Sequence, residues 1–232
     1  MKKLILFDID GTILLSSGAG RRAIIAALSE DIGTHESWDR IRFDGKTDPQ
    51  ILVELLEAAG HAGDPDEERV RQLGRKYVGL LREELARPGH KTTLMPGILP
   101  LLDRVDQADL VISGLLTGNF AEGAALKLES GGIDPRRFRV GAYGSDSPYR
   151  AELPPIAARR AEAMFGRVPT GHEVVIVGDT PADVTCGQCI GARAIGVATG
   201  SYSTTELKAA GAYAVFEDLS ETDAVLDAIL AD

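Results

Sequence analysis

Short apolar runs recur along the chain, separated by segments with helical periodicity. The runs cover residues 4–7, 110–116, 174–177, 194–197 and 213–216. Consecutive apolar positions are typical of strands buried on both faces, as in a parallel sheet. The helical patterns between them lie at residues 121–129, 155–165 and 181–190. This alternation predicts an α/β fold with an open, doubly wound, mainly parallel sheet.

The alternation stops after the first predicted strand. Between residues 16 and 92 there is no strand-like run, and the helical patterns there cover residues 20–31, 49–59 and 66–85. A capping spacing at Asp64 precedes the last of these patterns. We therefore predict that residues 16–92 form a helical subdomain inserted into a core of residues 1–15 and 93–232. Its expected hinges are residues 15–18 and 88–90.

The composition is that of an ordinary globular protein with an acidic surface. Hydrophobic residues make up 44% of the 232 positions, charged residues 26%, and the formal net charge is −10. Nucleic-acid binding needs a basic footprint, so this charge argues against such a partner. The chain has two cysteines, no signal-peptide core and no apolar run of about eighteen residues. We expect a cytoplasmic protein, monomeric or homodimeric, without a membrane or nucleic-acid partner.

A pair of aspartates follows the first apolar run, where ligands collect in doubly wound sheets. Asp8 and Asp10 are separated by one residue and can point into one pocket. Two like charges about 4 Å apart cost about 4 kcal/mol at an effective dielectric of 20, so the pair should bind a divalent cation or keep a proton. An ionised Asp is a nucleophile towards phosphorus, and a protonated one can protonate a leaving group. The alternative is a capped turn with two solvated acids.

A second acidic pair follows the run at residues 174–177. Asp179 and Asp183 are four positions apart, and Pro181 between them suits the first turn of a helix. If both carboxylates face the strand end, four acids surround one crevice and require a cation. Such hard oxygen ligands suit Mg²⁺. The same segment also fits a simple helix N-cap.

Two further features suit a phosphate group. Thr117-Gly118-Asn119 ends the second strong run, and a hydroxyl with exposed amides at a strand–helix junction can cradle an anion. Helix capping by Thr or Asn is an equal alternative there. Arg150 precedes a helical pattern, and its guanidinium can bind phosphate oxygens in a bidentate manner. An exposed surface arginine is the alternative.

The order of these segments resembles the haloacid dehalogenase (HAD) superfamily of phosphohydrolases. Residues 8–12 resemble its first motif, residues 117–119 its second, Arg150 its third and residues 178–183 its fourth. The helical insertion lies where the family carries a C1-type cap, and residues 43–48 are similar to the cap loop of phosphoglycolate-phosphatase-like members. The resemblance implies a Rossmann-like core with a helical cap over nearly the whole chain.

The resemblance also implies an activity, namely Mg²⁺-dependent hydrolysis of a small phosphate monoester. The substrate would be a small phosphorylated metabolite, phosphoglycolate-like or a sugar phosphate. Asp8 would become a phosphoaspartate, and Asp10 would act first as general acid and then as general base. The Mg²⁺ ligands would be Asp8, the backbone carbonyl of Asp10 and Asp179. Asp183 would orient a metal-bound water or the cation of the third motif.

Cationic side chains are assigned by the same resemblance. The second motif would hold the transferring phosphoryl group together with Arg150, which stands where the family usually has Lys. Lys127 is set aside as a substitute for it, because Lys127 falls in the middle of the helix after the second motif. Lys46 is expected to reach a second anionic group of the substrate, with a solvated surface lysine as the alternative.

Two other functions stay open. Asp10 makes dehalogenation unexpected, because the dehalogenases of the superfamily lack an acid at this position. A phosphomutase of the same superfamily would form an isomeric sugar phosphate rather than free phosphate. A non-catalytic, phosphate-responsive binding module would show slow phosphoaspartate turnover and a phosphorylation-dependent partner.

Overall fold

The central feature of the fold is a parallel sheet with the first strand in its middle. In the computed structural model, residues 1–61 and 66–231 are described. The sheet order is β5-β4-β1-β6-β7-β8, and every neighbouring pair is parallel. The strands are β1 (Lys3–Phe7), β4 (Val111–Thr117), β5 (Val140–Tyr143), β6 (Val174–Gly178), β7 (Arg193–Val197) and β8 (Ala214–Phe216). The predicted open parallel sheet is thus confirmed.

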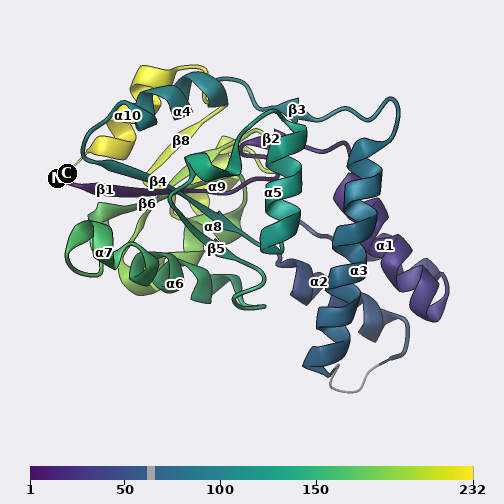
Figure 1. Cartoon of the computed structure of the whole chain (residues 1–232). Helices are drawn as coiled ribbons and strands as arrows, with labels where there is room; N and C mark the ends of the chain where they lie inside the picture. Colours follow the sequence, from purple (N-terminus) through teal and green to yellow (C-terminus); the bar gives the residue numbers. More distant parts are fainter. Residues whose placement is uncertain (62–65, 232) are drawn as a thin grey trace.

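Both faces of the sheet are buried by helices. The flanking helices are α4 (Ile98–Asp106), α5 (Ala121–Ser130), α6 (Leu153–Arg160), α7 (Glu162–Phe165), α8 (Pro181–Cys186), α9 (Thr204–Ala209) and α10 (Thr222–Leu230). Figure 1 shows α4 and α10 above the sheet and α6 and α7 below it. Because strand side chains alternate, Ile5 and Phe7 of β1 join the core under α4 and α10, whereas Leu4 and Leu6 join the core of α6. This double burial explains why β1 is apolar at consecutive positions.

The segment between the first strand and the second strong apolar run is helical. It contains α1 (Ala19–Ile32), the 3-10 helix η1 (Glu36–Arg40), α2 (Asp48–Ala58) and α3 (Glu67–Ala86). These helices bury a hydrophobic core of their own, which includes Trp38, Leu55 and Tyr77. None of the described residues from 16 to 92 lies in a strand, as predicted. The cap expected at Asp64 lies outside the described residues.

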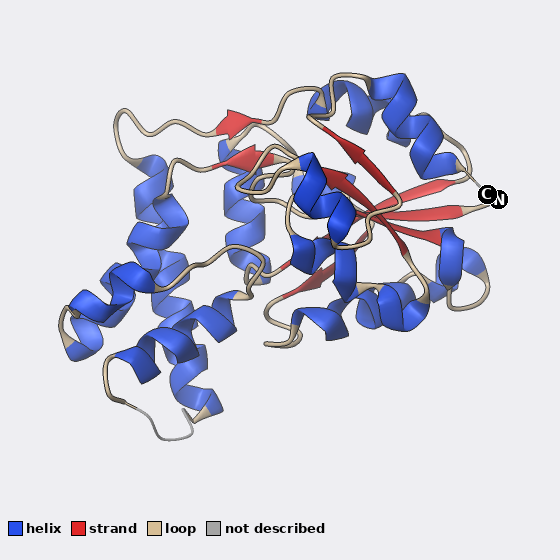
Figure 2. Cartoon of the chain, turned by 180° about the vertical axis from the view of Figure 1, so that it is seen from behind, coloured by secondary structure: helices blue, strands red, loops and turns tan. Residues whose placement is uncertain are grey.

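Two short strands mark where the chain leaves and rejoins the main sheet region. Leu14–Leu15 (β2) and Thr93–Leu94 (β3) pair antiparallel beside the helices, as Figure 2 shows from behind. The expected hinge at residues 15–18 contains Ser17, whose φ of 46° is in the left-handed region that most side chains avoid. Gly18 follows with φ 76° and precedes α1. The chain therefore changes direction sharply at this end of the insertion.

Several details differ from the sequence predictions, which did not include the short strands β2 and β3. Strand β5 was not predicted, because Val140-Gly141-Ala142-Tyr143 is short and its burial alternates at the edge of the sheet. The helix predicted over residues 155–165 is interrupted at Ala161 and forms α6 and α7. The helix predicted over residues 181–190 ends at Cys186 and continues as a 3-10 turn. No described helix combines the length and the apolar character that a membrane span requires.

Candidate active site

The sheet order brings the predicted motifs to one edge. Strand β1 lies between β4 and β6, so Asp8, Thr117 and Asp179 stand at the carboxyl ends of three adjacent strands. A cleft of about 510 Å³ opens there and is lined on the sheet side by these residues. Its other wall comes from α1, from residues 39–48 and from Tyr77 of α3. The cleft therefore lies between the sheet and the helical insertion.

Three carboxylates form a buried cluster at the base of the cleft. Asp8, Asp179 and Asp183 each offer an oxygen, and these oxygens all lie within 4.8 Å of one another. Their exposed fractions are 6%, 4% and 1%. Asp183 is held by its position in α8, where it forms a capping box with Thr180. Sequence positions 171 residues apart thus share one small volume, as the strand order requires.

Two glycines bring backbone close to Asp179. The carboxylate of Asp179 packs so tightly against Gly11 and Gly200 that a Cβ at either glycine would overlap it. Gly11 also has φ 87°, which a side chain would disfavour. The hydroxyl of Thr12 donates to Oδ1 of Asp179 at 3.2 Å. These contacts fix the orientation of the Asp179 carboxylate towards the cluster.

Burial gives this cluster unusual protonation behaviour. Loss of hydration raises the pKa of Asp8 to about 7, with Asp183 and Asp10 adding to the rise and Arg150 opposing it. Loss of hydration, together with Asp183 and Asp8, raises the pKa of Asp179 to about 9. Without a bound cation, these two carboxyl groups therefore tend to keep their protons near neutral pH. A cluster of desolvated carboxylate oxygens of this kind suits a hard divalent cation.

Arg150 is the cation of this cluster. It is 8% exposed and begins the 3-10 helix η3 (Arg150–Glu152). Its Nη2 lies 3.1 Å from Oδ1 of Asp8 and also donates to Oδ1 of Asp183. The two carboxylates raise the pKa of Arg150 above its ordinary value against the effect of burial. Arg150 is therefore a fixed positive charge in contact with the predicted nucleophile, and not a surface arginine.

A second cation enters the cleft from α5. The ammonium of Lys127 donates to Asp10 Oδ1 at 2.8 Å, to Asp10 Oδ2 at 2.6 Å and to Asn119 Oδ1 at 2.6 Å. The Asn119 amide donates to Asp10 Oδ2 at 2.8 Å and to Thr117 Oγ1 at 2.7 Å. The sequence interpretation had set Lys127 aside for its mid-helix position. Arg150, and not Lys127, contacts Asp8, and the Lys127 ammonium lies on Asp10 instead.

Asp48 is a site residue that sequence reasoning missed. It is 7% exposed at the start of α2, and its Oδ2 accepts from the backbone N–H of Phe120 at 2.8 Å. Its own backbone N–H donates to the carbonyl oxygen of Gly118 at 2.7 Å. Burial raises the pKa of Asp48 to about 6, and Lys127 opposes that rise. In the sequence Asp48 looks like an ordinary first-turn acid, and nothing local indicates a contact 70 residues away.

The outer part of the cleft carries cationic side chains of the insertion. Lys46 lines the cleft, and its ammonium pairs with Glu54. Arg21 also lines the cleft and stacks on the ring of Phe43, with its guanidinium carbon 4.5 Å from the ring centroid. Arg42 lines the cleft as well and lies 5.6 Å from the ring centroid of Tyr202, which belongs to the sheet side. Asp39 and Asp44 line the same part of the cleft, and Asp44 pairs with Arg42 at 2.9 Å, so this region holds charges of both signs.

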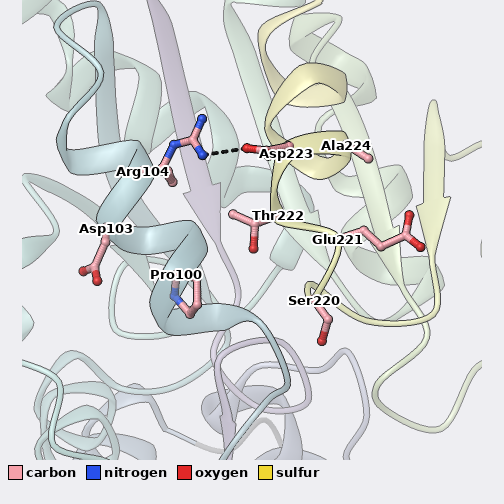
Figure 3. A pocket seen from close by; sticks show the side chains of 8 residues that line it. All are labelled: Pro100, Asp103, Arg104, Ser220, Glu221, Thr222, Asp223 and Ala224. Carbon is pink, nitrogen blue, oxygen red and sulfur yellow. Dashed lines mark hydrogen bonds and ion pairs between the residues drawn. The ribbon is translucent and has the colours of Figure 1, made fainter.

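A second hollow of about 510 Å³ lies between α4 and α10 and shares no lining residue with the cleft. Figure 3 shows its side chains, including the Arg104 guanidinium, which pairs with Asp223 at 2.6 Å. None of the sequence-predicted site residues lines it. Its exposed acids, among them Glu221, do not form a cluster with the buried oxygens described above.

Comparison with known proteins finds similar hydrolases. Residues 153–222 match a family described as HAD-hydrolase-like. The "Probable phosphatase IndB" of Dickeya dadantii (strain 3937) is 28% identical over 232 residues, covering 99% of this chain and 96% of the relative. The resemblance to the HAD superfamily that the motifs predict is thereby confirmed.

Solved structures share the fold over nearly their whole length. A hydrolase from Pseudomonas syringae has a TM-score of 0.72 at 23% identity, with 100% of both chains covered. CbbY from Rhodobacter sphaeroides, in complex with phosphate, has a TM-score of 0.74 at 21% identity, covering 95% of this chain and 96% of the other. At these identities the likeness shows the fold.

Proposed function

We propose that this chain, which is similar in sequence and fold to HAD-superfamily hydrolases, is a Mg²⁺-dependent phosphatase of small phosphate monoesters. The observation that carries the proposal is the buried cluster of Asp8, Asp179 and Asp183 at the carboxyl edge of the sheet, with Arg150 bound to it. The relative named as a probable phosphatase supports the same reaction class. The substrate would be a small phosphorylated metabolite, phosphoglycolate-like or a sugar phosphate.

In the first half of the reaction, a carboxylate oxygen of Asp8 attacks phosphorus. The bond between phosphorus and the ester oxygen breaks, and Asp10 gives its proton to that oxygen. Arg150 keeps Asp8 in place and favours its ionised form, which is the nucleophilic one. Thr117, Gly118 and Asn119 line the cleft beside these groups and would bind the phosphoryl oxygens.

In the second half, Asp10 removes a proton from a water molecule. The water oxygen attacks phosphorus, the bond to the Asp8 oxygen breaks, and inorganic phosphate leaves. Asp10 thereby regains the proton that it needs for the next turnover. The side chain of Asp10 is 41% exposed, unlike that of Asp8, so both a leaving alcohol and a water can reach it.

The metal ion would be held by Asp8, Asp179 and the backbone carbonyl of Asp10, with Asp183 directly beside them. When bound, Mg²⁺ supplies positive charge that lets an anionic nucleophile approach an anionic phosphoryl group. The desolvated, mutually repelling carboxylates fit such an ion, since its charge would return Asp8 and Asp179 to their ionised forms.

The helical insertion would act as a lid on the cleft. We assign residues 16–92 to this cap and residues 1–15 and 93–232 to the core. Arg42 of the insertion and Tyr202 of the core face each other at the entrance, where closure would exclude bulk water. Lys46 would exchange its partner Glu54 for a second anionic group of the substrate.

The test is phosphate release from a panel of small phosphate monoesters with Mg²⁺. We expect activity that EDTA removes, that Mg²⁺ restores, and that Asp8→Asn abolishes. Asp223→Asn is the matched control, because Asp223 is 79% exposed at its side chain and lines the separate hollow. Full activity of Asp8→Asn, or activity that EDTA leaves intact, contradicts the mechanism. Conversion of a sugar phosphate to an isomer without free phosphate would instead identify a mutase.

A further inference from the structure

We propose that Lys127 is a positioning residue that holds the carboxyl group of Asp10 in the orientation needed for proton transfer to the leaving alcohol, with the transferred proton on Oδ1, which accepts from Lys127 but not from Asn119. This inference rests on the proposed phosphatase function. It assigns to α5 a role in the chemistry of the ester, in addition to its packing against α3. No motif of the resemblance includes Lys127.

The ammonium group of Lys127 has a hydrogen-bond acceptor for each of its N–H donors. Its ammonium reaches both carboxylate oxygens of Asp10 and the side-chain oxygen of Asn119, so each of its three N–H groups has an acceptor between 2.6 and 2.8 Å away. Asn119 closes the triangle by donating to the same Asp10 carboxylate. These three hydrogen bonds favour one orientation of the Asp10 side chain over the others.

The residues around the Lys127 ammonium leave room for it. The Lys127 side chain is 6% exposed, and burial of an ammonium is costly unless it is paired. The neighbouring position on α1 is Gly20, where a Cβ would lie 3.3 Å from Nζ of Lys127 and 3.6 Å from the Tyr77 hydroxyl. A larger residue at position 20 would therefore crowd the ammonium.

Asp10 needs such support more than Asp8 does. Asp8 is enclosed by the buried cluster, whereas the side chain of Asp10 is 41% exposed and would otherwise sample several rotamers. Arg150 does not restrain the Asp10 side chain, because its guanidinium is bound to Asp8 and Asp183. Proton transfer requires a geometry held to within hydrogen-bonding distance, so an unrestrained Asp10 would transfer protons less often.

The experiment compares two esters in the full-length, Mg²⁺-loaded protein. The leaving group of p-nitrophenyl phosphate departs without a proton, whereas that of an alkyl phosphate requires one. The quantity compared is kcat/KM, because it reports only the steps up to phosphorylation of Asp8. For Lys127→Met we expect a loss of about 10- to 100-fold on the alkyl ester and less than about threefold on the aryl ester. Lys127→Arg should recover part of the loss.

Two controls separate positioning from folding. Lys127→Gln is shorter than lysine by one bond and uncharged, but it keeps a polar end in the buried site, so it provides a second variant with the same expected ester dependence if Lys127→Met does not fold. Lys76→Met removes another paired lysine, which is exposed on α3 and bound to Glu30. This variant should leave kcat/KM unchanged for both esters. Thermal unfolding of each variant records the structural effect separately.

A double mutant decides whether Lys127 acts through Asp10. In an Asp10→Asn background, Lys127→Met should produce no further ester-dependent loss. Equal losses on both esters, or an undiminished ester dependence in the Asp10→Asn background, would overturn the positioning role while leaving the phosphatase proposal intact. Absence of phosphate release by the wild-type protein from any ester would instead contradict the proposed function itself.

Discussion

The cleft contains two clusters that pair a cation with carboxylates, and they differ in exposure. In the Arg150 cluster, Arg150 binds Asp8 and Asp183, whose side chains are 9% and 1% exposed. In the Lys127 cluster, Lys127 binds Asp10, whose side chain is 41% exposed. Both clusters line the cleft, but Asp8 is almost wholly buried there whereas Asp10 is open to solvent over much of its side chain.

The difference corresponds to the chemistry that we assign to each acid. A nucleophile has to be held still and shielded, and desolvation of Asp8 by its neighbours does this. A group that exchanges protons with an alcohol and then with water has to be accessible to both. Asp10 meets this requirement, because Lys127 binds its carboxyl group while 41% of the side chain stays exposed. Each acid thus has its own cation in direct contact, Arg150 for Asp8 and Lys127 for Asp10.

The largest effect on kcat/KM is expected from substitutions of Asp8 and Asp10, which should differ in their dependence on the ester. Asp8→Asn should lower kcat/KM by roughly 10³-fold or more on aryl and alkyl phosphates alike, because no nucleophile remains. Asp10→Asn should lower it by about 10²-fold on an alkyl phosphate and much less on an aryl phosphate. Steady-state kinetics with both esters measures this. The same ester dependence in the two variants would contradict the division of roles.

The next effect concerns the cation of the closed cluster. Arg150→Met leaves two buried carboxylates unpaired, so the free energy of unfolding should fall by about 3 kcal/mol or more, and activity should fall with it. Arg150→Lys restores the charge but not the planar fork, and should recover stability better than activity. Urea unfolding and phosphate release measure the two quantities. An exposed arginine, Arg136, provides the control, since Arg136→Met should change neither.

A smaller effect is expected from pH and metal. The folded-state pKa values of about 7 for Asp8 and about 9 for Asp179 lie above the ordinary value of 3.8. The folded protein therefore binds more protons than the unfolded one, and stability is lost as pH rises through these values. The metal-free Tm should fall between pH 5 and pH 8, and Mg²⁺ should raise Tm more at pH 8.

Asp179→Asn is the matched variant for that measurement. It removes one of the repelling carboxylates and one proposed metal ligand. Its Tm should depend less on pH, and Mg²⁺ should raise it less, in differential scanning fluorimetry. If Mg²⁺ raised the Tm of Asp179→Asn as much as that of the wild-type protein, Asp179 would not be a ligand of the metal.

The smallest effect tests the entrance, which lies outside both clusters. Lys46→Met should raise KM severalfold for a substrate with a second anionic group and leave kcat nearly unchanged, because the Lys46 ammonium is assigned to that second group and not to the phosphoryl group that is transferred. A singly charged phosphate ester should show no change in KM. Lys76→Met serves again as the exposed control. A fall in kcat with unchanged KM would assign Lys46 to the chemistry instead.

The sheet and several site positions follow from local pattern. Continuous apolar runs predicted the strands, since burial on both faces demands such runs, and the polar residue after each run predicted a shared edge. Asp8 and Asp179 could be expected there because parallel strands align their carboxyl ends. Strand β5 was missed because an edge strand needs fewer apolar residues, so its pattern is weak.

The partner of each charge depended on three-dimensional packing. Lys127 and Asp10 are 117 positions apart in the sequence. They meet because the fold turns the Lys127 side chain of α5 into the cleft, where Gly20 leaves room for the ammonium. Asp48 contacts the second motif because α2 begins against it. The sequence shows which residues are acidic, basic or apolar. The interaction energy of two charges, however, depends on the distance between them and on their hydration. Both quantities are determined only by the tertiary structure.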